Sequence, residues 1–413
     1  MKLLKRLTAL CLTATMAFSV SACGYDRDKT AKDLSIENYV TIQVWYDNDS
    51  YTQYLNQVAS GFHSANELVT IKPVLVGSED YMSNIYNESV QNKNVADIYL
   101  MSSDDMQKAY MMGLTTENNA YDSVYNEKIY GKAGIQSASY NNKLYGYPVS
   151  FNTSYLVYNK KYVSGVDTFQ QLEDYCNSYE VTDENQDVSV IATWDVSSMF
   201  LNYGFASNEI EISNSDQDKT ATCKVTADGV RIKDVMKDYF GLKEKLGIDR
   251  NEVTMQSCID LFKEGKLLYT ILDANSLSQI SDSGVDYGIA NVPNLSEDHI
   301  THALSETTLA MVNPYTQSLE AARAVAKAIS YDYADQLTSK SGLQSARSDL
   351  KYKDQKDAMK ALHDIYGESV TKSGMIGADE LYLRYEIMIH QIWDGMSVDD
   401  AYNIFQQYLD KMK

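Results

Sequence analysis

Residues 40–101 alternate between strand-like and helix-like hydrophobic patterns, and this alternation restricts the fold more than any other feature of the sequence. Apolar and polar residues alternate over 40–45, and apolar residues then recur at helical spacing from Tyr54 to Phe62. A second strand (69–76), a second helix (80–91) and a third strand (96–101) follow. Strands that alternate with helices form a largely parallel sheet covered by helices, so the sequence predicts an α/β fold.

The first 24 residues have the three parts of a secretory signal. Lys2, Lys5 and Arg6 precede an apolar stretch over 7–20, and small residues lead to Cys23 and Gly24. The apolar stretch is short for a transmembrane helix. The small-small-cysteine ending resembles the lipobox of bacterial lipoproteins, in which the cysteine receives a diacylglycerol and acyl chains such as palmitate. The resemblance implies a signal peptide over 1–22 and lipidation at Cys23; an ordinary signal or a membrane helix is the alternative.

Charge and cysteine content limit the classes of partner. Removal of residues 1–22 would lower the Lys and Arg count from 36 to 33 against 57 acidic residues, which changes the net charge from −21 to −24. Nucleic acid and anionic lipid headgroups repel such a chain. Cys176, Cys223 and Cys258 remain in the mature chain without CxxC spacing, so neither a disulfide framework nor a metal site is predicted, although one bridge stays possible.

The mature chain is longer than one compact core commonly requires, which favours two lobes. Residues 23–38 are polar and aperiodic and are interpreted as a flexible tether. A capping box at Thr168 and Gln171 predicts a helix start, and Ser397 caps a final helix whose apolar face runs from Val398 to Met412.

The order of several segments resembles that of extracellular solute-binding proteins of sugar-type ABC importers, the maltose-binding-protein-like family. The segments that carry the resemblance are 40–47, 94–100, 146–150, 155–160, 262–266, 287–293 and 307–313. The resemblance implies a periplasmic-binding-protein-like fold in which crossing strands form a hinge between two α/β lobes. Crossings are expected near 147–152, 306–309 and 346–350. They would place lobe one at 39–148 with 309–345, and lobe two at 151–306 with 346–413.

Polar residues follow three of the expected strands. Ligands of open α/β sheets bind beyond the carboxyl ends of the strands, which favours these loops as a binding site. The candidates are Tyr46, Asp47 and Asn48 after the first strand, Ser103 and Asp104 after the third, and Asp273 and Asn275 after the strand over 267–272. The resemblance also places polar sugar contacts at the first two loops, whereas the aromatic residue common in the third loop is missing here. Asp104 is alternatively a helix cap.

Three further candidates are less specific. Tyr147 and Asn152 flank the first expected crossing and are predicted to line the base of a cleft. Trp194 is predicted either to stack on a sugar ring from lobe two or to pack in the core.

No GxSxG, HExxH or P-loop motif occurs, and neither a cofactor nor a metal is expected. Together with the lipobox and the family resemblance, this absence of motifs predicts a non-enzymatic, monomeric protein, lipid-anchored on the extracytoplasmic face of the cell membrane. It would bind a carbohydrate, with an oligosaccharide favoured, for ABC importer permease subunits. The alternatives are a membrane-anchored glycan-degrading enzyme, which needs two paired carboxylates, and a nutrient-sensing lipoprotein with the same fold.

Overall fold

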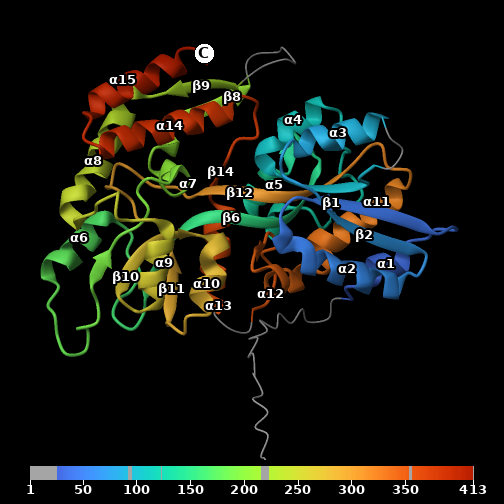
Figure 1. The fold of residues 1–413 in the computed structure, drawn as a ribbon, viewed down its shortest axis with the longest axis horizontal. Coiled ribbons are helices and arrows are strands. Elements are labelled where there is room, and N and C mark those ends of the chain that lie inside the picture. Colours follow the sequence, from blue (N-terminus) through green and yellow to red (C-terminus); the bar gives the residue numbers. More distant parts are fainter. Residues whose placement is uncertain (1–25, 92–94, 122, 215–222, 353–355, 413) are drawn as a thin grey trace, which may run out of the picture.

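A computed structural model describes residues 26–91, 95–121, 123–214, 223–352 and 356–412. The signal peptide predicted over 1–22 and the lipidation site Cys23 lie outside these residues. Figure 1 shows two α/β lobes on either side of strands β6 (Gly146–Asn159) and β12 (Leu304–Val312). The predicted two-lobed α/β fold with a hinge of crossing strands is confirmed.

Lobe one contains the alternating segment that opened the sequence. Strand β1 (Val40–Tyr46) pairs in parallel with β2 (Val69–Leu75) and with β3 (Ile98–Ser102). The helices of this lobe are α2 (Thr52–Ala65), α3 (Tyr81–Gln91), α4 (Met106–Met111), α11 (Leu319–Lys327) and α12 (Leu337–Ser341). The apolar face of α2 buries Tyr54, Leu55, Val58 and Phe62, as its periodicity predicts.

The crossing strands make one sheet of both lobes, in the order β2-β1-β3-β12-β6-β10-β7. β12 pairs antiparallel with β3 through 308–312 and antiparallel with β6 through 305–311. The far half of β6 pairs antiparallel with β10 (Leu267–Asp273) and β11 (Tyr287–Ala290). The sheet is therefore mixed rather than largely parallel, because two strands return across the hinge.

Lobe two surrounds the other end of this sheet. Its remaining strands are β7 (Val190–Ala192) and the hairpin of β8 (Ile210–Asn214) and β9 (Cys223–Ala227). Its helices are α6 (Phe169–Ser178), α7 (Met199–Asn202), α8 (Gly229–Leu246), α9 (Met255–Lys263), α10 (Leu277–Ser281), α14 (Ala378–Trp393) and α15 (Val398–Leu409). The capping box of α6 and the Ser397 cap of α15 are confirmed.

Two helices and two short strands complete the hinge. They are α5 (Glu127–Ser137), β13 (Gln344–Ser345), α13 (Lys356–Gly367) and β14 (Val370–Thr371). β13 pairs with the middle of β6, and β14 pairs with the first residues of β12. After β14 the chain passes along the lobe boundary as the segment 372–376, called here the strap, and enters α14 (Figure 1).

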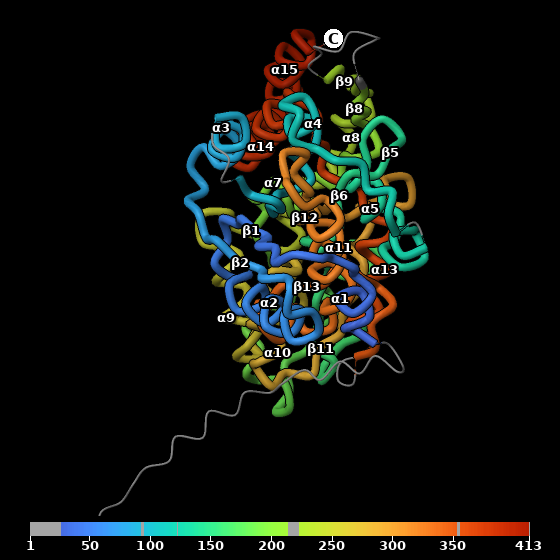
Figure 2. The backbone as a smooth tube through the Cα atoms, turned by 90° about the vertical axis from the view of Figure 1, so that its right-hand side faces the viewer, coloured from blue at the N-terminus to red at the C-terminus, as the bar shows by residue number. Residues whose placement is uncertain are grey.

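The prediction of a flexible tether over 23–38 does not describe its second half. Helix α1 (Lys29–Asp33) packs against lobe one beside α2 and α11 (Figure 2). Arg27 pairs with Asp335, Tyr333 donates a hydrogen bond to Asp28 (2.8 Å), and Ala31 is buried. These tertiary contacts order a segment whose own sequence has too little periodicity to predict a helix. Within the five described stretches, no helix is long and apolar enough to cross a membrane.

Candidate functional site

The loop after β1 opens onto a cavity of about 380 Å³ in lobe one. Asp47 and Asn48 are exposed at its rim, and Ser102 and Thr308 line it from β3 and β12. The Asn48 side chain accepts a hydrogen bond from the Ser50 amide (3.0 Å) and so caps the following turn. Both predicted residues therefore reach solvent at the carboxyl end of their strand.

The loop after β3 carries an ion cluster that joins three segments of the chain. Lys372 Nζ lies 2.6 Å from Asp104 Oδ2 and 3.0 Å from Glu306 Oε1. Asp104 follows β3 in lobe one, Glu306 lies in crossing strand β12, and Lys372 begins the strap. Asp104 also stands at a helix start, but neither short helix of this loop receives a side-chain cap bond from it.

Burial and the neighbouring charges together shift the pKa values of Glu306 and Lys372. Burial raises the pKa of the Glu306 carboxyl, the nearby Lys372 ammonium opposes that rise, and the Asp104 carboxylate adds to it. Burial alone would lower the pKa of Lys372, but Asp104 and Glu306 outweigh it and raise this pKa above its ordinary value. Lys372 is therefore a permanent cation between two acidic groups.

A second polar cluster lies on the lobe-two side of the hinge. Asn152 Nδ2 donates a hydrogen bond to Asp273 Oδ2 (3.2 Å), and Asn152 Oδ1 accepts one from the Asn275 amide (3.2 Å). Asp273 also accepts a hydrogen bond from the Ser276 amide (3.0 Å), which fixes the turn after β10. The structure thus brings together three of the predicted residues, one from crossing strand β6 and two from the end of β10 and the turn after it.

The two clusters form one continuous line of polar groups. Glu306 is the direct antiparallel partner of Asn152 in the β12–β6 ladder, and side chains of directly opposed residues project from the same face of a sheet. We call this line the hinge polar row; its members, from lobe one to lobe two, are Asp104, Lys372, Glu306, Asn152, Asp273 and Asn275.

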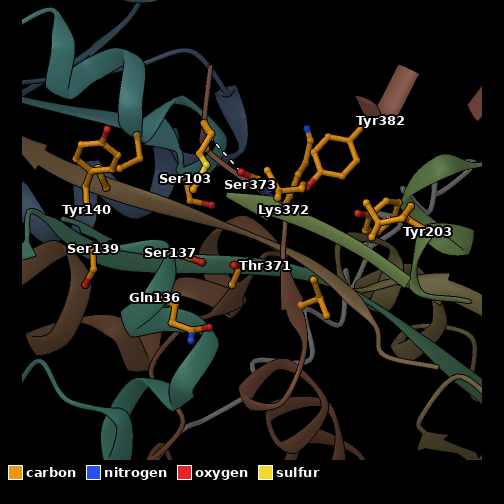
Figure 3. A pocket seen from close by; sticks show the side chains of 16 residues that line it. Ser103, Gln136, Ser137, Ser139, Tyr140, Tyr203, Thr371, Lys372, Ser373 and Tyr382 are labelled. Carbon is orange, nitrogen blue, oxygen red and sulfur yellow. Dashed lines mark hydrogen bonds between the residues drawn. The ribbon is translucent and has the colours of Figure 1, made fainter. Parts of the chain in front are cut away.

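A cavity of about 310 Å³ lies beside the row, between the lobes. Figure 3 shows Ser139 and Tyr140 on one side of it and Tyr203 and Tyr382 on the other. Ser103, another predicted site residue, lines this cavity, and its hydroxyl accepts a hydrogen bond from the Thr307 amide (3.1 Å). Ser103 therefore joins the loop after β3 to crossing strand β12.

Three predicted aromatic residues are buried in cores instead. The Trp194 side chain is 2% exposed, packs against Phe169, and donates from Nε1 to Asn202 Oδ1 (2.8 Å). Tyr147 is fully buried against Tyr125. Tyr46 is buried, and its hydroxyl pairs with Thr52 Oγ1 (2.9 Å). In this structure their rings offer no surface to a ligand, so the contacts predicted for them are not proposed further.

A family model described as bacterial extracellular solute-binding protein matches residues 57–352, most of the chain. The chain belongs to this family. The matched region contains both crossing strands and five of the six members of the hinge polar row, whereas Lys372, the partner of Asp104, lies beyond it.

Among relatives of this solute-binding protein is the galactooligosaccharide-binding protein of Bacillus subtilis (strain 168). The two are 25% identical over 317 residues, which are 71% of this chain and 69% of the relative.

Solved structures show the same fold at lower identity. One is an extracellular solute-binding protein from Staphylococcus aureus in complex with maltose (TM-score 0.74, 17% identity, 92% of this chain and 98% of that chain). Another is a cyclo/maltodextrin-binding protein complexed with maltotetraose (TM-score 0.73, 14% identity, 92% and 98%).

Two members of the row, Glu306 and Lys372, were not predicted as site residues. Glu306 stands at the start of the expected second crossing, where an acidic residue on a buried strand is an available signal. Lys372 lies in a short segment without periodicity, and no local pattern distinguishes it from the other lysines.

Proposed function

We propose that this chain is a lipid-anchored solute-binding protein that captures an uncharged oligosaccharide between its lobes and delivers it to an ABC importer. The observation that carries the proposal is the hinge polar row, which runs across both crossing strands from one lobe to the other. A ligand on this row would touch both lobes at once, which is the condition for a ligand to favour the closed arrangement.

The chemistry of the row suits sugar hydroxyls. Carboxylates accept charge-assisted hydrogen bonds, and asparagine side chains both donate and accept. The row holds three acidic residues and one lysine, so its net charge is negative when all are ionised. A negative site attracts neutral sugars through hydrogen bonds but repels sugar acids.

The named ligands of the relatives point to the same class. The Bacillus relative is named for galactooligosaccharides, and two structural neighbours hold maltose and maltotetraose. These names support an oligosaccharide here, while the choice between galactose and glucose units is left to experiment.

The first experiment is a thermal-shift screen followed by calorimetric titration. We expect maltotetraose or a β-galactotetraose to raise the melting temperature, because a ligand that binds only the folded form stabilises it. Trigalacturonate is the charged control and should leave the melting temperature unchanged. Product analysis of each mixture tests the alternative hypothesis of a glycan-degrading enzyme. The appearance of shorter sugars would support that enzyme and contradict a protein that only binds.

Lobe closure is tested by solution scattering. The crossing strands connect the lobes through few residues, and motion of such lobes is hinge bending. A binding tetrasaccharide should reduce the radius of gyration. A tight complex with an unchanged scattering curve would instead indicate a rigid, preformed site.

The lipid anchor and the importer are tested in cells. Cys23→Ala should release the protein from the membrane fraction or leave it unprocessed, whereas Cys176→Ala should change neither. Normal processing and membrane retention of Cys23→Ala would contradict the anchor. Loss of sugar uptake in a deletion strain supports delivery to an importer, whereas intact uptake with a lost transcriptional response would indicate a nutrient sensor.

A further inference from the structure

Lys372 is the cationic member of the hinge polar row. Its ammonium contacts both Asp104 and Glu306, and its side chain is only 15% exposed. The Tyr382 ring of α14 lies beneath the ammonium at 5.8 Å and limits where the cation can move (Figure 3). The ammonium is therefore confined between a lobe-one loop, a crossing strand and a lobe-two helix.

Backbone hydrogen bonds fix the strap from which Lys372 projects. The Lys372 amide donates to Ser305 O (2.7 Å), directly beside Glu306 on β12. In α4 of lobe one, the Gln107 amide donates to Gly374 O (3.1 Å), and Gln107 Oε1 accepts from the Ile376 amide (2.7 Å). A Cβ at Gly374 would collide with the Ser103 carbonyl oxygen, so the strap lies directly against the loop that carries Asp104. The backbone of the strap at Lys372 thus cannot move away from the lobe-one loop without breaking these contacts.

Acidic groups otherwise surround Glu306. Asp104 from the loop after β3 and Asp273 from the end of β10 both raise the pKa of the Glu306 carboxyl, in addition to burial. Asp105 lies next to Asp104, and Lys372 is the cation that opposes these effects on Glu306. Removal of this cation would leave the Glu306 carboxyl with Asp104 and Asp273 as acidic neighbours. Like charges close together favour protonation of one of them.

We infer that Lys372 is a positioning residue of the sugar site, which keeps Glu306 ionised and holds Asp104 and Glu306 oriented as hydrogen-bond acceptors for an uncharged oligosaccharide. This inference rests on the proposed function. The contacts of Lys372 with both carboxylates leave the lysine itself little capacity for ligand contact. Its role is therefore to keep the Glu306 carboxyl charged and to hold it aligned with Asp104 in a partly buried hinge.

The test compares the pH dependence of sugar binding in three variants. Affinity for maltotetraose and for β-galactotetraose is measured by calorimetry from pH 5 to 8 in the wild type, Lys372→Met and Lys372→Arg. Lys360→Met is the matched control, because Lys360 forms an exposed ion pair with Asp364 on α13. For Lys372→Met we expect a dissociation constant that rises by about tenfold or more between pH 8 and pH 5, since one pKa unit corresponds to a factor of ten. Lys372→Arg should restore most of the wild-type profile, and Lys360→Met should match the wild type.

Two further measurements separate electrostatics from folding. The double variant Lys372→Met/Glu306→Gln should lose the added pH dependence, because the group that titrates is gone. Selective ¹³C labelling of glutamate carboxyls, assigned with Glu306→Gln, should show a higher pKa for Glu306 in Lys372→Met than in the wild type. The carboxyl titration needs no sugar, and Lys372→Gln replaces Lys372→Met if the latter melts below the measuring temperature.

The outcomes are distinct. A wild-type protein that binds neither tetrasaccharide contradicts the proposed function, and the carboxyl titration then decides the electrostatic role of Lys372 by itself. A wild type that binds, together with a Lys372→Met variant of unchanged affinity and unchanged pH profile, overturns the role of Lys372 and leaves the proposed function standing. An unchanged Glu306 pKa in Lys372→Met also overturns it.

Discussion

The hinge polar row and the aromatic residues Tyr46, Tyr147 and Trp194 occupy comparable places near strand ends, yet their surroundings differ. Asp104 and Glu306 keep 18% and 30% of their side chains exposed, and both contact Lys372. Trp194 and Tyr147 are 2% and 0% exposed and pack on other rings. One region is built from polar contacts between segments, and the other from apolar packing within each core.

Because of this difference, we expect the row to contribute mainly to ligand affinity and the buried rings mainly to the stability of the fold. Polar side chains that contact one another at a partly open surface can exchange those contacts for a ligand at small cost to the fold. Aromatic rings in a close-packed core have no such freedom, and their removal leaves a cavity. Substitutions in the row should therefore change binding, and substitutions of the buried rings should change the free energy of unfolding.

The largest effect is expected for Trp194→Ala. Loss of the ring and of its hydrogen bond to Asn202 should lower the free energy of unfolding by about 3–5 kcal/mol. Sugar affinity, measured well below the melting temperature, should stay within about twofold of the wild type. Trp194→Phe is the milder control. Weakened binding with an unchanged denaturation curve would place Trp194 in the cleft.

Asp104→Ala should weaken sugar binding and leave the free energy of unfolding nearly unchanged. A hydrogen bond to a charged group contributes about 1.5–3 kcal/mol, so calorimetry should show affinity reduced by about tenfold to a hundredfold. Asp364→Ala, which removes an exposed carboxylate of α13, is the control and should bind normally. Wild-type affinity in Asp104→Ala would show that this carboxylate serves the fold alone.

Asn152→Ala should have a smaller effect on binding. Asn152 is neutral and holds Asp273 and the Asn275 amide. A hydrogen bond between this neutral side chain and a sugar hydroxyl should contribute about 0.5–1.5 kcal/mol. Calorimetric titration should show a loss of affinity of about threefold to tenfold. Asn87→Ala, at an exposed position of α3, is the control. A loss of affinity larger than that of Asp104→Ala would show that the lobe-two end of the row contributes more to sugar binding than the lobe-one end.

Tyr147→Phe should have the smallest effect. Among the described residues the Tyr147 hydroxyl has no hydrogen-bond partner, although it is buried. Removal of an unsatisfied buried hydroxyl should leave stability unchanged or raise it by about 1 kcal/mol in a denaturant titration. A clear loss of affinity or stability would mean that the hydroxyl has a role, such as contact with a bound ligand.

Much of the architecture could be predicted because the periodicities are local. The strand and helix patterns over 40–101 match β1, α2, β2, α3 and β3 within a few residues, and the cap at Ser397 marks the start of α15. The family resemblance carried by the order of the later segments predicts two lobes and three crossings, of which strands β6 and β12 contain the first two. The mixed direction of the sheet was missed because strand direction depends on which segments return across the hinge.

The site was only partly predictable, for physical reasons that particular residues illustrate. Asp47, Asn48 and Asp104 follow strands whose ends can be read from the pattern, and they reach the expected edge of the sheet. Lys372 gives no such signal, because its role comes from carboxylates 268 and 66 positions earlier in the chain. Trp194 shows the converse: a favourable residue type at a plausible position is buried, because Phe169 of α6 and Asn202 of α7 contact its ring.

The sequence by itself therefore determined the α/β class and the strand-end loops, since hydrophobic periodicity and helix capping act over a few neighbouring residues. The length of the chain and its family resemblance indicated the two lobes. The tertiary structure alone decided which polar residues meet, which aromatic rings are covered, and that segment 26–36 packs on lobe one. These properties depend on contacts between residues that are distant in the chain, and no local pattern encodes the direction from which a partner arrives.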